Sequence, residues 1–192
     1  WDVPDELYES CRLGARRAVE RGWEILVAGG SALDACQEAI IELEEDPVFD
    51  AGIGSHLNRD GVAQLDAILM DGISLKSGAV ACVEHIRNPI QLARLVLDRS
   101  EHMLLTGYGA EQFARENGFP LCDPSIFKIP AELNRWSERS AGSMRMGTVG
   151  AVALDLRGNL AAGTSTGGTF FKYPGRVGDS PLVGCGCYAD NI

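Results

Sequence analysis

The sequence has few of the features that mark membrane, nucleic-acid-binding or disulfide-stapled proteins. It has no apolar run near the ~20 residues that span a bilayer. Its 17 basic residues face 27 acidic ones, and the net charge of −10 argues against nucleic acid as a partner. The six cysteines are scattered along 192 residues, and no signal-peptide pattern opens the sequence. We therefore expect a cytoplasmic protein with reduced thiols and no membrane segment.

Signatures of cofactor binding are also scarce. The segment Gly52-Ile-Gly54 lacks the third glycine of a dinucleotide-binding turn, and no phosphate-binding loop with its lysine occurs. The histidines, at positions 56, 85 and 102, do not have the spacing of metal ligands on a helix. We therefore expect no organic cofactor.

What the sequence does contain is typical of one folded domain over residues 1–192, with 45% apolar and 23% charged residues. Apolar residues recur at helical spacing over 5–26, and Ser31 with Asp34 three positions later predicts the start of a second helix. Further patterns predict strands at 62–70, 77–83 and 103–106, and helices at 89–100 and 110–117. Helices followed by antiparallel hairpins indicate an α+β fold with a sheet covered by helices.

The second half of the chain is divided by a polar segment. Residues 119–147 hold three prolines and show no lasting period, so we expect a surface linker there. Residues 148–155 and 160–166 then predict a β-hairpin around the turn at Arg157-Gly158-Asn159, and Leu182 is expected to begin another strand.

The junction Gly147-Thr148 carries the strongest chemical signal. A cut between these residues would give Thr148 a free α-amino group, whose pKa of about 7.7–8 lets it act as the base for its own hydroxyl. Before the cut, the same hydroxyl can attack the carbonyl of Gly147, because glycine tolerates a strained backbone. The ordinary alternative is a threonine that begins a strand after a loop.

Other polar residues are expected to lie near this junction. The short hairpin should return Thr166 beside Thr148, where it could bond the threonine hydroxyl. Arg176 and Asp179 follow in a loop at the same end, and they suit the α-carboxylate and α-amino groups of an amino acid. A mutual surface ion pair between them is the alternative.

The polar residues Asp50, Asn58, Asp60 and Asp66 raise the question of a metal site. They lack the regular spacing of a calcium-binding loop, and a structural loop rich in turns accounts for them. A loop of this kind can also direct backbone carbonyls at a monovalent cation, and the sequence leaves that alternative open.

Several motifs together resemble the plant-type asparaginase/isoaspartyl peptidase family of N-terminal-nucleophile hydrolases. They are found in the segments 46–55, 65–72, 78–81, 147–155, 158–162, 164–168 and 175–181. The resemblance implies a four-layer αββα sandwich and a precursor that is cut before the threonine. Residues 1–147, with the linker at about 119–147, then correspond to the first subunit, and 148–192 to the start of the second. It also implies a homodimer of processed units.

The resemblance implies a role for each candidate residue. Thr148 is the nucleophile and the new N-terminus after autocleavage at Gly147, Thr166 assists its hydroxyl, and Arg176 and Asp179 bind substrate. A sodium-binding loop is implied as well, with main-chain carbonyl ligands from Leu43, Glu44, Asp46, Phe49, Ala51 and Ile53. The implied reaction cleaves the β-amide of asparagine or of β-aspartyl (isoaspartyl) dipeptides through a β-aspartyl-threonine ester.

Two departures from the family pattern qualify this expectation. Asp50 stands where the family has asparagine, and an ionised carboxylate cannot donate a hydrogen bond as an amide can. Neither the family's glycine-rich opening strand nor the segment that supplies its oxyanion hole is among residues 1–192, so we expect a sandwich incomplete at both ends. A catalytically silent, partner-binding fragment therefore remains an alternative, as does a relative acting on glycosylated asparagine or on protein aspartyl sites.

Overall fold

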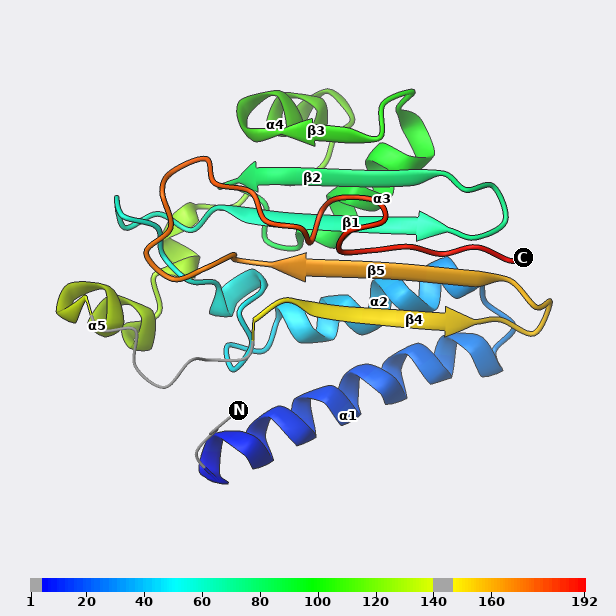
Figure 1. The fold of residues 1–192 in the computed structure, drawn as a ribbon, viewed down its shortest axis with the longest axis horizontal. Coiled ribbons are helices and arrows are strands. Elements are labelled where there is room, and N and C mark those ends of the chain that lie inside the picture. Colours follow the sequence, from blue (N-terminus) through cyan, green and yellow to red (C-terminus); the bar gives the residue numbers. More distant parts are fainter. Residues whose placement is uncertain (1–4, 140–146) are drawn as a thin grey trace.

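The computed structural model describes residues 5–139 and 147–192, and in these ranges five α-helices accompany one β-sheet (Figure 1). The fold is therefore α+β, as the sequence predicts. The helices are α1 (Asp5–Val27), α2 (Ala32–Glu44), α3 (Pro89–Arg99), α4 (Gly107–Glu116) and α5 (Pro130–Glu138). Two short 3₁₀ helices, η1 (Gly52–Gly54) and η2 (Pro124–Phe127), lie in the loops. None of the helices in the described ranges has the length and apolar character needed to cross a membrane.

The helix boundaries follow local signals in the sequence. The hydroxyl of Ser31 accepts a hydrogen bond from the backbone N–H of Asp34 at 3.1 Å, which caps the first turn of α2. Gly29 makes the turn between α1 and α2 with a φ of +84°, a conformation that favours glycine. Pro89 occupies the first turn of α3, where its missing N–H has no helical partner to lose. These starting points confirm the predicted helices.

The sheet has five strands in the order β3-β2-β1-β5-β4. The strands β1 and β2 form an antiparallel hairpin, β4 and β5 form a second, and β5 pairs antiparallel with β1. Only the β2–β3 pair is parallel. The two hairpins confirm the predicted pairings. The strands are β1 (Leu65–Asp71), β2 (Ser77–Val83), β3 (Leu104–Thr106), β4 (Val149–Leu154) and β5 (Leu160–Thr166).

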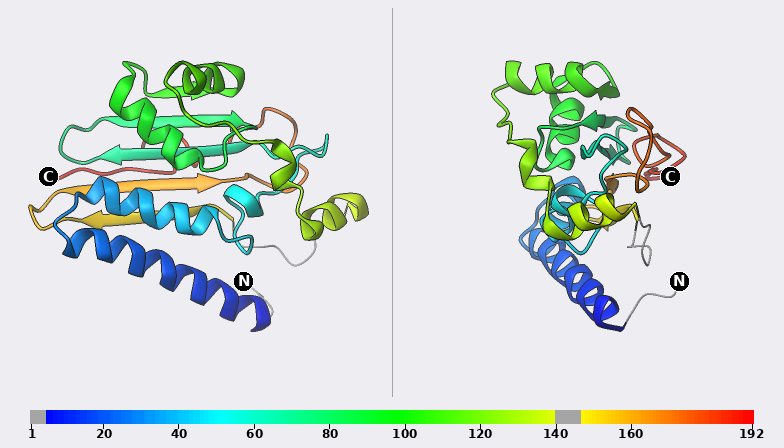
Figure 2. Two further views of the ribbon diagram at one scale, coloured as in Figure 1. Left: turned by 180° about the vertical axis from the view of Figure 1, so that it is seen from behind. Right: turned by 90° about the vertical axis from the view of Figure 1, so that its left-hand side faces the viewer.

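Both faces of the central strand β1 are covered. On one face, Leu69 belongs to the main core together with Ile40 of α2 and Ile90 of α3. On the other face, Met70 packs in a smaller apolar cluster with Cys187 of the C-terminal segment. Figures 1 and 2 show α2 and α3 behind the sheet, α1 beside α2, and the C-terminal segment crossing in front. The described residues thus contain one sheet, and the four-layer sandwich stays a prediction.

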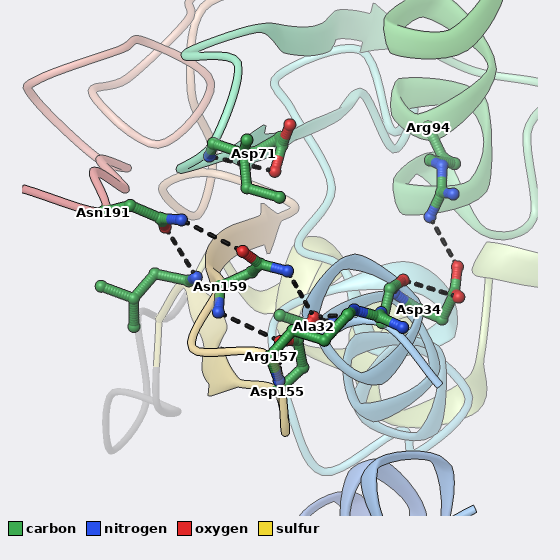
Figure 3. A network of polar contacts seen from close by, with 11 residues as sticks. Ala32, Asp34, Asp71, Arg94, Asp155, Arg157, Asn159 and Asn191 are labelled. Carbon is green, nitrogen blue, oxygen red and sulfur yellow. Dashed lines mark hydrogen bonds and ion pairs between the residues drawn. The ribbon is translucent and has the colours of Figure 1, made fainter. Parts of the chain in front are cut away.

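The far end of the β4–β5 hairpin is tied to two distant segments (Figure 3). Asp155 accepts hydrogen bonds from the backbone N–H groups of Asn159, at 3.0 Å, and of Ala32, at 3.4 Å. Near the C-terminus, the side-chain oxygen of Asn191 accepts one from the backbone N–H of Leu160 at 2.8 Å. These contacts fix the hairpin against the start of α2 and hold the C-terminal segment against the start of β5.

The expectation of an irregular linker at 119–147 is wrong for most of that segment. Residues 119–139 contain η2 and α5, while residues 140–146 lie outside the described residues. Phe127 of η2 and Glu132 of α5 are fully buried. The three prolines do not prevent this order, because Pro124 and Pro130 stand at the first turns of η2 and α5.

The strand expected from Leu182 is also absent from the described residues. Residues 182–186 form turns in which the backbone N–H groups of Cys185 and Gly186 both bond to the carbonyl of Leu182. An isolated bridge joins Val183 to Cys187. The glycines at 184 and 186 favour this tight path over an extended one, and Gly184 has a φ of +78°. All six cysteines are free.

Candidate active site

The sequence-predicted site residues meet at one end of the sheet. A pocket of about 130 Å³ lies between the start of β4, the end of β5 and the loops that precede η1 and follow β5. It is lined by Asp50, Gly147, Thr148, Thr166, Gly168, Thr169, Arg176, Gly178, Asp179 and Ser180. The structure thus brings together every residue predicted for the nucleophile, its assistance, the cut and substrate binding.

The strand register aligns two of these side chains, Thr148 and Thr166, with Asp66 of β1. Thr166 pairs with Asp66 across β5 and β1, and Val149 pairs with Ser165 across β4 and β5. Extending the second register by one residue sets Thr148 opposite Thr166. Paired residues in antiparallel strands project to the same face, so the exposed Thr148 stands at the end of a row across three strands. The Thr166 hydroxyl accepts a hydrogen bond from the backbone N–H of Gly168 at 3.0 Å.

Ser180 is a pocket residue that the sequence reasoning missed. Its hydroxyl oxygen lies 2.7 Å from that of Thr148, within hydrogen-bond distance. Ser180 is buried, and its carbonyl accepts a hydrogen bond from the Thr164 hydroxyl at 2.7 Å. The only sequence signal was its place directly after Asp179 in the glycine-rich segment 175–181.

Asp50 lies on the floor of the pocket and is 2% exposed. Its side chain accepts a hydrogen bond from the backbone N–H of His56 at 2.9 Å, and its carbonyl accepts one from Gly167 at 3.0 Å. A Cβ on Gly167 would overlap the Asp50 carboxylate, so the backbone passes here because the residue is glycine. Burial raises the pKa of Asp50 to about 6, and the group can take up or release a proton near neutral pH.

Lys172 is a buried cation beneath the pocket that the sequence did not reveal. It is 4% exposed, and its ammonium donates a hydrogen bond to the backbone carbonyl of Gln64 at 2.7 Å. Burial lowers the pKa of Lys172, whereas the nearby carboxylates of Asp66 and Asp50 raise it. A buried charge needs such compensation. The side chain fits because Gly168 leaves space, since a Cβ there would lie 2.8 Å from the ammonium nitrogen.

Arg176 and Asp179 lie on the exposed rim of the pocket. No ion pair joins them in the part of the chain that the structure describes, so the alternative of a mutual surface pair is not realised. Their loop is held from below, because Gly175 donates its backbone N–H to the side-chain oxygen of Gln64 at 2.8 Å. A guanidinium and a carboxylate on one rim suit a zwitterionic amino acid.

The loop predicted to hold sodium folds its backbone carbonyls closely against its own glycines. A Cβ on Gly52 would overlap the carbonyl oxygen of Glu44, and one on Gly54 would overlap that of Phe49. Two of the six predicted ligand oxygens therefore face the same glycine turn. Backbone oxygens are suitable ligands for a hard cation. The described residues contain no group of three or more His, Cys, Asp or Glu side chains that could hold a different metal.

A larger cavity of about 510 Å³, between α1, α2 and β4, does not carry comparable chemistry. Its lining is mostly apolar, with Ala39, Leu43 and Val152 among the contacts. Cys36 also lines it, but burial raises the pKa of this thiol to about 12, so the thiolate is absent at neutral pH. The smaller polar pocket is therefore the candidate active site.

Comparison with known proteins defines the family to which this chain belongs. The family model described as Asparaginase (Asparaginase_2) matches residues 2–192, and the chain belongs to this family. The isoaspartyl peptidase of Salmonella typhimurium is 53% identical over 187 residues, covering 90% of this chain and 60% of that protein. The isoaspartyl peptidase/L-asparaginase of Xenopus laevis is 46% identical over 196 residues, covering 98% and 63%. The chain thus spans about 60% of the length of these curated relatives.

Proposed function

We propose that this chain carries the nucleophile and substrate clamp of an autoprocessing threonine amidohydrolase. Its substrates would be asparagine, β-aspartyl (isoaspartyl) dipeptides, or both. The observation that carries the proposal is one pocket lined by Thr148, Arg176 and Asp179. The names of the relatives, isoaspartyl peptidase and L-asparaginase, support the choice of amide.

The first step is self-cleavage. The hydroxyl oxygen of Thr148 attacks the carbonyl carbon of Gly147, and the C–N bond between the two residues breaks as the nitrogen takes up a proton. The resulting ester is hydrolysed by water, which leaves a carboxylate on Gly147 and a free α-amino group on Thr148. The exposed position of this junction at the pocket supports the step, since water can reach it.

The second step is hydrolysis of the substrate. Arg176 binds the α-carboxylate through parallel hydrogen bonds and Asp179 binds the α-ammonium group, which directs the β-carbonyl to Thr148. The neutral α-amine of Thr148 takes the hydroxyl proton as the oxygen attacks, then gives it to the departing ammonia or amino acid. Water releases aspartate from the β-aspartyl ester. Thr166, in register opposite Thr148, assists the hydroxyl.

Asp50 adjusts this chemistry through its charge. Because burial raises its pKa to about 6, a protonated fraction exists near neutral pH and can donate a hydrogen bond as an amide would. The ionised fraction cannot donate, and it stabilises the ammonium form of the Thr148 terminus, which weakens that amine as a base. We therefore propose that the hydrolytic activity falls as Asp50 ionises.

The assembly is part of the same proposal. A structural sodium ion would be held by backbone carbonyls of the loop from Leu43 to Ile53 and would brace the segment that carries Asp50, without taking part in catalysis. The processed units would form a homodimer, as the family resemblance implies. The scattered cysteines favour the cytoplasm as its location. Neither nucleic acid nor a membrane is a proposed partner.

Substrate turnover by the wild-type chain and three variants tests the proposal. The wild-type chain is expected to release ammonia from asparagine or aspartate from a β-aspartyl dipeptide, whereas Thr148→Ala is expected to release neither. Arg176→Ala should leave self-cleavage intact and raise KM, because it removes only the carboxylate clamp. The exposed Arg99→Ala is the matched control. Equal turnover by wild type and Thr148→Ala would refute the mechanism, and a wild-type chain that neither splits nor turns over substrate would favour the silent fragment.

A further inference from the structure

The helix α5 is fastened to the loop behind Asp50. Its Trp136 donates the indole N–H to the backbone carbonyl of Asn58 at 2.8 Å. The same indole packs over Gly61, where a Cβ would lie 3.2 Å from the ring. One turn earlier, Glu132 of α5 is fully buried and its carboxylate lies 3.0 Å from Nδ1 of His56. These contacts join α5 to the segment 56–61.

Among the described residues, the contact between Glu132 and His56 extends to a third polar side chain. The guanidinium of Arg135 donates to the other oxygen of Glu132 at 2.7 Å and lies 3.2 Å from Nδ1 of His56. His56 is 7% exposed. Polar and charged groups removed from water remain buried only when their partners compensate them. Loss of one member would therefore leave the others buried without compensation, which costs more than the loss of an exposed ion pair.

His56 connects this network to the pocket through two contacts, one made by its backbone and one by its ring. Its backbone N–H is the group that donates to the Asp50 carboxylate at 2.9 Å. Its ring meets the ring of Phe170 edge-on, with centroids 5.8 Å apart, and Phe170 directly follows the pocket residue Thr169. A displacement of the imidazole would thus move the donor to Asp50 on one side and the loop after β5 on the other.

The position of α5 in the chain adds a second consequence. The helix ends at Glu138, nine residues before Gly147, and it is the last described element before the junction. Fixing α5 on the loop of Asp50 also fixes the last described residues before the junction, Glu138 and Arg139. A tethered group reacts faster when its attachment point holds it near the partner.

We propose that Glu132 is a positioning residue that acts through His56. It anchors α5, and thereby sets the carboxylate of Asp50 in the pocket and the position of the C-terminal end of α5, which precedes the Gly147–Thr148 bond in the chain. The second effect rests on the proposed self-cleavage, whereas the first does not. Glu132 itself touches neither the substrate nor the reacting atoms.

The test compares Glu132→Gln with Asn134→Gln in the full chain. The first variant keeps the size of the side chain and removes its charge, and the second changes an exposed residue of the same helix. Hydrogen exchange reports the docking of α5, and the ¹³C NMR signal of the Asp50 carboxyl group reports its hydrogen bond and charge. A gel assay follows the appearance of the fragments 1–147 and 148–192.

In Glu132→Gln we expect exchange in 130–138 and 50–58 to accelerate about tenfold or more while the sheet is unaffected. The Asp50 signal should shift and the cut should slow, and Asn134→Gln should match the wild type in all three. An unchanged Asp50 signal, an unchanged rate of cutting, or faster exchange throughout the molecule would each overturn the proposal. If the wild type does not cut, the proposed self-cleavage fails. Hydrogen exchange and the NMR signal of Asp50 then still decide whether Glu132 anchors α5.

Discussion

The hydroxyl oxygens of Thr148 and Ser180 lie 2.7 Å apart at the candidate nucleophile. Ser180 is held in turn by the Thr164 side chain, which bonds to its backbone carbonyl from the middle of β5. The rotamer of the exposed threonine is therefore set from the rigid sheet. A nucleophile gains most from such fixed geometry, because misplacement of the attacking atom raises the barrier.

Replacing Ser180 with alanine should slow self-cleavage without abolishing it. The variant loses one hydrogen bond to Thr148, and a typical net value of about 0.5–1.5 kcal/mol corresponds to a rate reduced roughly two- to tenfold. Quantitative gels of freshly made chain measure the rate. The exposed Ser125→Ala is the control, and a Ser180→Ala chain that cuts at the rate of this control would show that the contact does not orient the nucleophile.

Asp50 should make stability depend on pH in a defined direction. Burial raises its pKa in the folded protein from 3.8 to about 6, so the folded state favours the protonated group. This contribution is fully present below pH 3.8 and is lost as the pH rises through about 6. Asp50→Asn is neutral throughout, so its gain in unfolding free energy over the wild type should grow to about 3 kcal/mol by about pH 8.

Urea unfolding of wild type and Asp50→Asn at a series of pH values measures this difference. The exposed Asp60→Asn, on the same loop, should show no such growth. A constant difference between Asp50→Asn and wild type across the range would mean that Asp50 does not titrate as its burial implies.

Lys172→Met should destabilise the fold beneath the pocket. The substitution keeps most of the side-chain volume but removes the hydrogen bond to the buried carbonyl of Gln64 and the positive charge near Asp66. Leaving a buried acceptor unsatisfied typically costs about 1–3 kcal/mol. The midpoint of urea unfolding should fall accordingly, whereas the exposed Lys128→Met should behave as wild type. Equal midpoints for the two variants would exclude a compensating role for Lys172.

Sodium should stabilise the folded chain. A cation that binds only the folded state raises the free energy of unfolding with its concentration. The thermal midpoint should therefore be higher in sodium chloride than in choline chloride of equal ionic strength. Gly54→Ala should abolish the difference, because its Cβ would overlap the carbonyl of Phe49. A midpoint identical in both salts would argue against the cation site.

Much of the framework was predictable because it depends on local signals. Ser31 and Asp34 indicate a capped helix within four residues, and the alternation in 148–155 and 160–166 indicates a hairpin. Once the hairpin is known, the meeting of Thr148 and Thr166 follows from its register. The convergence of Asp50 with this end required the family resemblance, because no local pattern links residues so far apart in the sequence.

The parts that were missed depend on buried polar groups. Helix α5 escaped notice because it is short and its fully buried residue is Glu132, whose burial no hydrophobic period can reveal. Lys172 was missed for the same reason, since a lysine is ordinarily exposed. Its burial follows only from the space at Gly168 and the facing carboxylates, which are brought together by the tertiary fold.

Intact mass spectrometry of the purified chain shows whether it cuts itself between Gly147 and Thr148. We expect two species from the wild type, one ending at Gly147 and one beginning at Thr148 with an unmodified α-amino group, and one uncut species from Thr148→Ala. A wild-type chain that stays whole on prolonged incubation, or an alanine variant that still divides at this bond, would contradict the proposed self-cleavage.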